Sequence, residues 1–457
     1  MKSSLLTILR KEPNRVNKRR LLSIAFVFTL SALFVLSALS SVRTLTWCVV
    51  APLTILLFGK VLLGFSSSFI SELEDDAHGF TNYIPKETPF YKSQGFKLLI
   101  CLILFRVAVF FIGHVMNNAN AQTGFMDGLW LWTKSDSNSY LGIAENGYVN
   151  EGDARFHIVF FPLYPLFIRL FSYIFGYLRS ALFVSNICAV LGGYMLYRLV
   201  RLETDDKTAL RSAKYYFILP AGIFLGSAMS DSLFFLLSVC TMYELRRRRF
   251  LSAGIFGMLA AFTRSLGLML AVPFFIEWLN FFMSNKKGER ILKTWKSALC
   301  VLIIPIGLVG YLVINKLVTG DALRFMTYQK EHWSQSFGFF FDTTAYQTDY
   351  LIKSDIRQKI ALWLPNLIYI FSSLIIVGIA QKHMRAAYTG YFLAYFAIAI
   401  GVTWLLSGPR YLTCAFTLPY ALAVITRNKN TDTIATALCL TGFLIYLAFY
   451  AAGLPVY

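Results

Sequence analysis

Residues 96–115, FKLLICLILFRVAVFFIGHV, form a largely apolar run. A helix of about 20 apolar residues is long enough to cross a hydrocarbon core about 30 Å thick. Comparable apolar runs recur from Leu21 almost to the C-terminus. The pattern predicts an all-α, polytopic membrane protein in which one helical membrane domain accounts for nearly the whole chain.

The composition agrees with a membrane protein. Of the 457 residues, 57% are hydrophobic and 15% are charged, whereas soluble domains carry roughly 25% charged residues. The formal net charge is +19, but the lysines and arginines form short clusters between the apolar runs. Such clusters are typical of cytoplasmic loops, so we expect the lipid bilayer as a partner and no nucleic acid.

The alternation of apolar runs and basic loops predicts a bundle of about 11–13 transmembrane helices. A basic arm, two spans and a cytoplasmic loop form a first unit, residues 1–95, and residues 96–457 form the second. Residues 116–158 and 319–355 are the two predicted external loops. The expected spans are Leu21–Leu39, Thr46–Phe65, Phe96–Val115, a return by Tyr197, two hairpins within Tyr215–Tyr243 and Phe250–Leu279, and Ala298–Val318, Gln358–Ala380, Ala387–Leu406, Tyr411–Ile425 and Thr433–Ala452.

A polar stretch in the first external loop, KSDSNSYLGIAENGY at 134–148, carries the carboxylate of Asp136. Asp136 precedes a predicted helix, Ser137–Glu145, and could act only as its N-cap. The alternative is a general base that takes the proton of a hydroxyl at the membrane surface, beside Tyr140 and Trp132. The two roles are compatible. Farther along, the prolines of Phe160–Pro165 disfavour a regular helix start and predict an interfacial or re-entrant segment.

Three further charged residues interrupt or border apolar runs, where an ionised side chain is costly. Asp231 lies in the turn Ser227–Ser232 and Arg264 in the turn Thr263–Ser265. Each of the two side chains could face a cavity or a charged partner. The simpler alternative is that Asp231, with Ser230, caps the helix that follows, and that Arg264 extends its side chain to the membrane interface. Arg410 follows Gly-Pro at an external helix end, where it either binds phosphate or anchors the helix.

The sequence predicts no nucleotide site and no firm metal site. No Walker loop or GxGxxG follows a strand, and no histidine pair has the spacing of a zinc motif. External carboxylates could bind a divalent cation loosely. Because no cytosolic domain can hold an activated sugar or nucleotide, we expect a lipid-linked substrate.

Five motifs in order carry a resemblance to a known family. The chain resembles the PIG-V-type mannosyltransferases, which include the enzyme that adds the second mannose in GPI-anchor assembly and its bacterial relatives. The motifs are SDSNSYLGIAENGY at 135–148 with FFPLYPLFIR at 160–169, PAGIFLGSAMSDSLF at 220–234, AAFTRSLG at 260–267, GDALRF at 320–325 through Trp333, and SGPRY at 407–411.

The resemblance implies a GT-C-like fold and an inverting transfer of a sugar, most simply mannose, from a polyprenyl-phosphate donor on the extracytoplasmic side. It implies Asp136 as the catalytic base and Arg264 and Arg410 as ligands of the donor phosphate. Asp231, Tyr140, Trp132 and Glu145 are the implied substrate-binding residues. The acceptor is a glycolipid, a glycan or a protein, and the expected location is a bacterial plasma membrane, or the endoplasmic reticulum in a eukaryote.

One position departs from the family pattern. The family usually carries Trp immediately before the acid, whereas here Ser135 stands there and Trp132 lies three residues earlier. This departure keeps open an inactive relative that acts as an assembly subunit. A transporter or flippase of lipid-linked saccharides also stays open, because many spans and intramembrane charges are equally typical of such a protein.

Overall fold

The computed structural model describes residues 29, 32, 35, 44–74, 93–121, 127–285 and 289–457. Within these ranges the chain is helical, and the one isolated β-bridge pairs Phe337 with Val402. The predicted first span, Leu21–Leu39, and the basic arm lie outside the described residues apart from three isolated positions. The predicted all-α class is confirmed.

Seven helical stretches of the described chain are long and apolar enough to cross a membrane. They are α2 (Leu45–Glu74), α3 (Gln94–Ala121), α6 (Tyr177–Glu203), η5 (Ser265–Leu270) with α10 (Ala271–Ser284), α11 (Arg290–Leu299) with η6 (Cys300–Ile303) and α12 (Ile304–Thr319), α15 (Ile356–Gln358) with η7 (Lys359–Trp363), α16 (Leu364–Ala380) and η8 (Gln381–His383), and α20 (Lys429–Ala451). The chain is therefore a multi-pass membrane protein.

Two further apolar pairs are sharply bent. The pair η3 (Asp153–Val159) and α5 (Leu163–Phe175) bends by 113°, and the pair η4 (Pro220–Gly226) and α8 (Asp231–Arg246) bends by 98°. The first bend falls at Phe160–Pro162, which agrees with a segment that does not simply cross. The expectation that the prolines disfavour a helix start within Phe160–Pro165 is wrong, because α5 begins at Leu163 and carries Pro165 in its first turn, where a missing N–H is tolerated. The second falls at the predicted turn Ser227–Ser232, after α7 (Asp206–Ile218).

Shorter helices complete the bundle. Two apolar ones are α9 (Phe250–Thr263), which forms the predicted second hairpin with α10, and α17 (Ala386–Ile400). The predicted span Tyr411–Ile425 is divided into α18 (Gly408–Cys414) and α19 (Thr417–Ile425). The remaining elements are η2 (Asp127–Thr133), α4 (Ser137–Asn146), α13 (Arg324–Trp333) and α14 (Phe340–Lys353).

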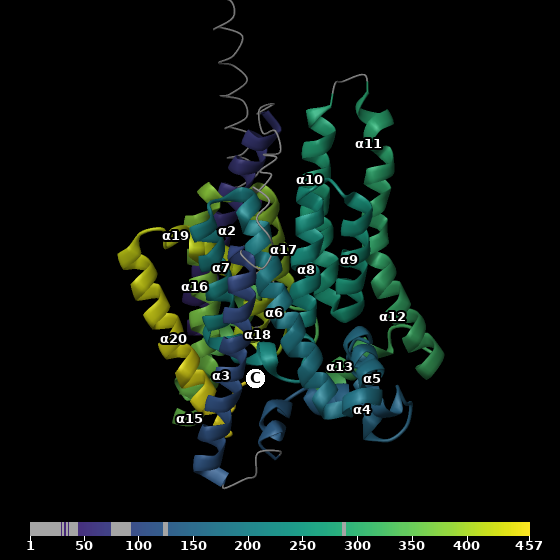
Figure 1. Ribbon diagram of the computed structural model, residues 1–457, viewed down its shortest axis with the longest axis vertical. Coiled ribbons are helices and arrows are strands. Elements are labelled where there is room, and N and C mark those ends of the chain that lie inside the picture. Colours follow the sequence, from purple (N-terminus) through teal and green to yellow (C-terminus); the bar gives the residue numbers. More distant parts are fainter. Residues whose placement is uncertain are drawn as a thin grey trace, which may run out of the picture.

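The segments predicted to be external lie at one end of the bundle. Figure 1 shows α4, α5 and α13 together at the end opposite the one where α10 ends and α11 begins, with α15 also toward that end. The other end holds a buried ion network, in which Arg246 pairs with Glu203 and Glu277, and Arg385 pairs with Glu277 and Glu72. The arrangement agrees with the predicted sidedness of the loops.

Helix α2 is tied to the rest of the bundle at both ends. Near its start, Trp47 Nε1 donates to Asp342 of α14 at 2.7 Å, and Thr46 Oγ1 donates to Asp349 at 2.6 Å. Near its end, Glu72 accepts from the backbone N–H of Ala386 at 2.7 Å. The first two bonds connect part of the predicted N-terminal unit to the second predicted external loop, and the third connects it to the start of α17. The division into two units stays a prediction.

The sidedness leads to a labelling experiment. Asn138 lies in the first turn of α4 and its side chain is exposed. In the variant Asn138→Cys, an impermeant thiol reagent applied to intact cells is expected to label the new cysteine. The measurement is labelling before and after permeabilisation, with the unsubstituted chain as control for its own exposed cysteines. Labelling of the new cysteine only after permeabilisation would overturn the predicted orientation.

Candidate functional site

Four charged residues from distant parts of the chain form one cluster. Asp136 precedes α4, Asp231 begins α8, Arg264 lies between α9 and η5, and Arg410 lies in α18. Arg410 Nη2 lies 2.6 Å from Asp136 Oδ2, Arg264 Nη1 lies 2.5 Å from Asp231 Oδ1, and Arg410 Nε lies 3.7 Å from the same Asp231 oxygen. We call these residues the charged cluster; its two carboxylates and two guanidinium groups balance in formal charge.

The carboxylate of Asp136 does not cap α4. The residue stands at the N-cap position, but its backbone is helical (φ −68°, ψ −10°) and its side chain accepts no capping hydrogen bond. The carboxylate accepts from Arg410 instead, and its side chain is 23% exposed, against 2–13% for the other three members. The capping interpretation is therefore wrong for the side chain, and Asp136 is the member most accessible to a substrate.

Asp231 lies between the two arginines. Its side chain is 2% exposed, and it also accepts from Cys414 Sγ at 3.2 Å. Neither it nor Ser230 caps α8 through a side chain, because Ser230 Oγ is 2.9 Å from the hydroxyl of Tyr140. The capping interpretation fails here too. Asp231 holds two buried cations in place, since each would be costly without a partner.

The two arginines are buried as members of this cluster. Arg264 is in an extended conformation (φ −156°, ψ 145°) that separates α9 from η5, and its side chain is 13% exposed. Arg410 is 4% exposed and also donates to Met229 Sδ at 3.2 Å. Both guanidinium groups lie over the ring of Tyr411, at 4.9 and 5.4 Å from its centroid. Neither arginine extends to the interface as a lone anchor, so those interpretations are wrong.

Tyr140 borders the cluster. Its hydroxyl bonds Ser230, and its ring packs edge-on against Phe160 and Tyr164, with centroids 5.1 Å away in both cases. Burial raises the pKa of the Tyr140 phenol well above its usual value. The hydroxyl therefore stays protonated at neutral pH and can donate a hydrogen bond, but it cannot serve as a base.

Trp132 and Glu145 lie outside the charged cluster. Trp132 is 1% exposed, and its ring packs against Phe110 at 4.7 Å and Tyr450 at 5.9 Å. Its carbonyl accepts from the N–H of Ala228 at 2.9 Å, which joins the Asp136 segment to the turn before Asp231. Glu145 is exposed on α4. Their predicted roles in substrate binding stay predictions.

Two basic residues near the site were missed in the sequence. Lys134 donates to the carbonyl of Tyr450 in the last turn of α20 and lies 4.6 Å from the centroid of its ring. Arg106 of α3 is 3% exposed and packs behind η4. The sequence does carry a signal for Arg106, because it is a charged residue within the apolar run 96–115.

The described residues offer no ready set of metal ligands. Within the described ranges, no group of three or more His, Cys, Asp and Glu side chains could hold a metal ion. Both carboxylates of the charged cluster already accept from guanidinium groups. A loosely bound divalent cation would therefore compete with Arg264 and Arg410 for these oxygens.

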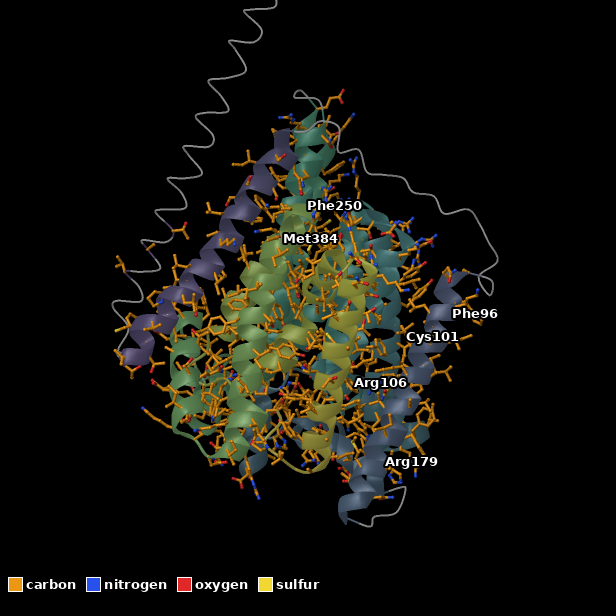
Figure 2. All side chains as sticks on the ribbon, turned by 90° about the vertical axis from the view of Figure 1, so that its left-hand side faces the viewer. Phe96, Cys101, Arg106, Arg179, Phe250 and Met384 are labelled. Atoms are coloured by element: carbon orange, nitrogen blue, oxygen red, sulfur yellow. The ribbon has the colours of Figure 1, made fainter. Side chains whose placement is uncertain are left out.

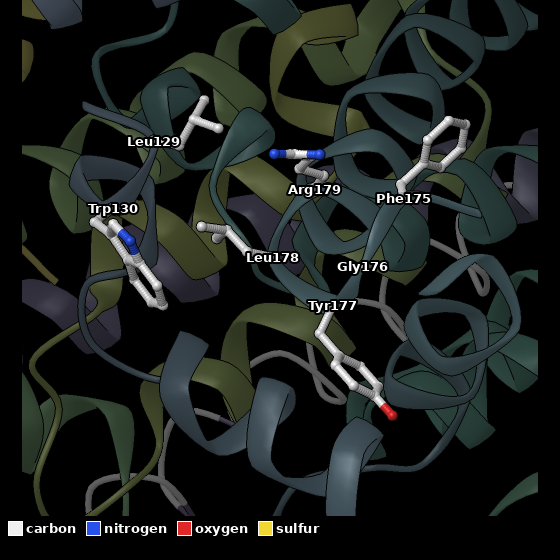
Figure 3. A pocket seen from close by; sticks show the side chains of 7 residues that line it. All are labelled: Leu129, Trp130, Phe175, Gly176, Tyr177, Leu178 and Arg179. Carbon is white, nitrogen blue, oxygen red and sulfur yellow. The ribbon is translucent and has the colours of Figure 1, made fainter. Parts of the chain in front are cut away.

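A separate cavity of about 410 Å³ opens beside η2 and the junction of α5 with α6. Figure 3 shows its lining, which is mostly aromatic and aliphatic. The lining residues are Leu129, Trp130, Phe175, Gly176, Tyr177, Leu178 and Arg179. None of them belongs to the charged cluster, although Trp130 lies in η2, a few residues before Asp136.

The fold and the site define a class: a multi-pass helical membrane protein with a buried ionic cluster close to one end of the bundle. Comparison with known families narrows it. The family model described as Mannosyltransferase (PIG-V) matches residues 100–316. This range includes three members of the charged cluster and confirms the resemblance predicted from the motifs.

Curated relatives agree over shorter stretches. The GPI alpha-1,6-mannosyltransferase 2 of Mus musculus is 34% identical over 158 residues, which is 32% of this chain and 31% of that protein. The GPI mannosyltransferase pigv-1 of Caenorhabditis elegans is 30% identical over 202 residues, 40% of this chain and 28% of that protein. The chain thus matches about a third of the length of these relatives.

Solved structures of ArnT from Cupriavidus metallidurans are also similar. The crystal structure of ArnT bound to undecaprenyl phosphate gives a TM-score of 0.45 at 14% identity, covering 77% of this chain and 75% of that one. The apo structure gives a TM-score of 0.47 at 14% identity, covering 79% and 76%.

Proposed function

We propose that the protein is an integral-membrane glycosyltransferase. It moves a sugar, mannose, from a polyprenyl-phosphate donor to an acceptor hydroxyl on the extracytoplasmic side, with inversion at the anomeric carbon. The observation that carries the proposal is the carboxylate of Asp136, which does not cap its helix and is the most exposed member of a charged cluster otherwise buried. The names of the matched family and relatives support mannose as the sugar.

In the proposed reaction, the charged cluster has two functions, proton transfer and stabilisation of the leaving phosphate. Asp136 takes the proton of the acceptor hydroxyl as its oxygen bonds to the anomeric carbon. The bond between that carbon and the phosphate oxygen breaks, and the polyprenyl phosphate leaves with the electron pair. Arg264 and Arg410 stabilise the charge that develops on the phosphate, because guanidinium groups match phosphate oxygens bidentately.

The contacts among the four residues suit this division. Arg410 contacts Asp136 and lies beside Asp231, so one of the two proposed phosphate ligands also contacts the proposed base. Asp231 fixes both arginines by bonding one and lying within ion-pair distance of the other.

The lipid part of the donor has suitable surroundings. Several helices expose large apolar side chains, among them Leu104 and Phe111 of α3 and Leu166 and Leu170 of α5. A prenyl chain can lie against such a surface within the bilayer while its phosphate reaches the interface. The acceptor, a glycolipid, a glycan or a protein, presents the hydroxyl whose proton Asp136 takes.

A membrane assay separates this function from transport. Membranes that contain the protein are expected to transfer labelled mannose from polyprenyl-phosphate mannose to an acceptor in the same membranes, giving a new covalent product. Membranes from cells without the protein serve as the control. A flippase would instead move the intact donor across sealed vesicles and leave its covalent state unchanged, and an assembly subunit would give neither result. Either of those outcomes would overturn the proposal.

A further inference from the structure

A buried arginine lies behind the charged cluster. Figure 2 shows Arg106 about midway along α3, between the ends of the bundle marked by Phe250 and Arg179. Its neighbours Leu104 and Val107 are 61% and 60% exposed on the outer face of the helix, but Arg106 itself is 3% exposed and points inward. No Asp or Glu of the described residues lies within ion-pair distance of it, and its Nη2 is buried without a hydrogen-bond partner.

The guanidinium group contacts α6 and the short element η4. Arg106 Nε donates to Asn186 Oδ1 of α6 at 2.9 Å, and Nη1 lies 3.5 Å from the carbonyl oxygen of Gly222. Asn186 Nδ2 in turn donates to the carbonyl of Gly226 at 3.2 Å. A side chain of α6 thus satisfies the carbonyl of Gly226 at the end of η4, where the helix leaves it without a partner, and Arg106 adds a second, longer contact to the carbonyl of Gly222 in the middle.

Gly226 is needed for this approach. A Cβ atom at position 226 would lie 1.5 Å from Arg106 Nη2 and 2.6 Å from its Cζ. It would also lie 2.9 Å from Asn186 Oδ1. The guanidinium group therefore occupies the space that a side chain would fill, and only glycine lets it lie against this backbone.

The element that Arg106 holds leads directly into the charged cluster. The turn after Gly226 contains Met229, whose sulfur accepts from Arg410, and then Ser230, whose hydroxyl bonds Tyr140. Asp231 follows and bonds Arg264. A displacement of η4 would move all three contacts together, because the turn is short and its backbone is continuous with η4.

The burial of an unpaired cation argues against a role in packing alone. A guanidinium group without a carboxylate is costly in a membrane interior, and an apolar side chain of similar volume often replaces buried charges without loss of stability. We propose that Arg106, together with Asn186, is a positioning residue that fixes η4 so that Met229, Ser230 and Asp231 meet their partners. The catalytic part of this inference rests on the proposed function.

The test combines a stability, a reactivity and a kinetic measurement on Arg106→Met. Thermal unfolding in detergent is expected at an unchanged or higher temperature. In a background where the other six cysteines are replaced, Cys414, which donates to Asp231, is expected to react faster with a small maleimide. The kcat for sugar transfer is expected to fall by about 10- to 100-fold, as for a misplacement of about 1 Å. Arg106→Lys, which keeps the cation, is expected to recover part of the kcat.

Two further variants complete the design. Lys97→Met removes an exposed cation from the same helix and is expected to change none of the three measurements. In the same single-cysteine background, Gly226→Ala is expected to speed the modification of Cys414, and to speed it less when Arg106→Ala removes the clash. An Arg106→Met protein that unfolds at lower temperature, with unchanged Cys414 reactivity, would show a purely structural role and overturn the inference. If the natural chain transfers no sugar, the proposed function fails, while Cys414 reactivity still decides on positioning.

Discussion

Asp136→Asn is expected to lower sugar transfer by about 10²- to 10⁴-fold, the usual contribution of a general base. The amide keeps the shape of the side chain but cannot accept the acceptor's proton. It also weakens the bond to Arg410, which lies 2.6 Å from the carboxylate. The measurement is the initial rate of labelled mannose transfer in membranes at matched protein levels.

The matched control for this substitution is Asp153→Asn. Asp153 is an exposed aspartate in the first turn of η3, in the same predicted external loop and outside the charged cluster. Its substitution makes the same change in charge and is expected to leave the rate unchanged. Transfer that is equal in Asp136→Asn and in the natural chain, at equal expression, would remove Asp136 from the proposed role of base.

Asp231→Ala is expected to cost about 3–5 kcal/mol of stability, because it leaves two buried guanidinium groups without their shared carboxylate. Arg264 and Arg410 are 13% and 4% exposed and lie 2.5 and 3.7 Å from the same oxygen of Asp231. The measurement is thermal unfolding in detergent, followed by the fraction of protein that stays monodisperse after heating.

A double substitution tests whether this loss comes from the unpaired charge. When Asp231→Asn is combined with Arg264→Gln, both members of the closest ion pair become neutral, and stability is expected to exceed that of Asp231→Ala. A double variant that is less stable than Asp231→Ala would mean that the residues act independently, against the geometry of the cluster. Neither variant is expected to transfer sugar.

Much of the fold was readable because long apolar runs have few alternatives to a membrane helix. The hairpin turns at Asp231 and Arg264 were found because a charge in an apolar run marks a helix end. The division between α18 and α19 was not predicted, although the sequence carries a signal for it. Pro419 lies in the first turn of α19, and a proline there cannot continue a helix from Ala415. Hydropathy does not record this signal, because proline does not interrupt the apolar run.

The candidate site was only partly readable. Each of the four cluster residues stood out alone, but their pairing joins positions as distant in sequence as Asp136 and Arg410, and only the fold brings these together. For the same reason, capping was a reasonable interpretation of Asp136, because the residue does precede a helix. Arg106 was missed because the run around it satisfies the criteria of a lipid-facing span, and its inward direction depends on a glycine in η4.

The anchoring of Lys134 on α20 sets limits on how this protein can be recombined with its relatives. The segment Lys134–Asp136 turns through Ser135, which has a left-handed backbone (φ 58°), and Lys134 is bound to the carbonyl of Tyr450 in the final helical turn. The match to the family model ends at residue 316. A chimera joined there would separate the Asp136 segment from its anchor, so a functional exchange must take the C-terminal helix together with the first external loop.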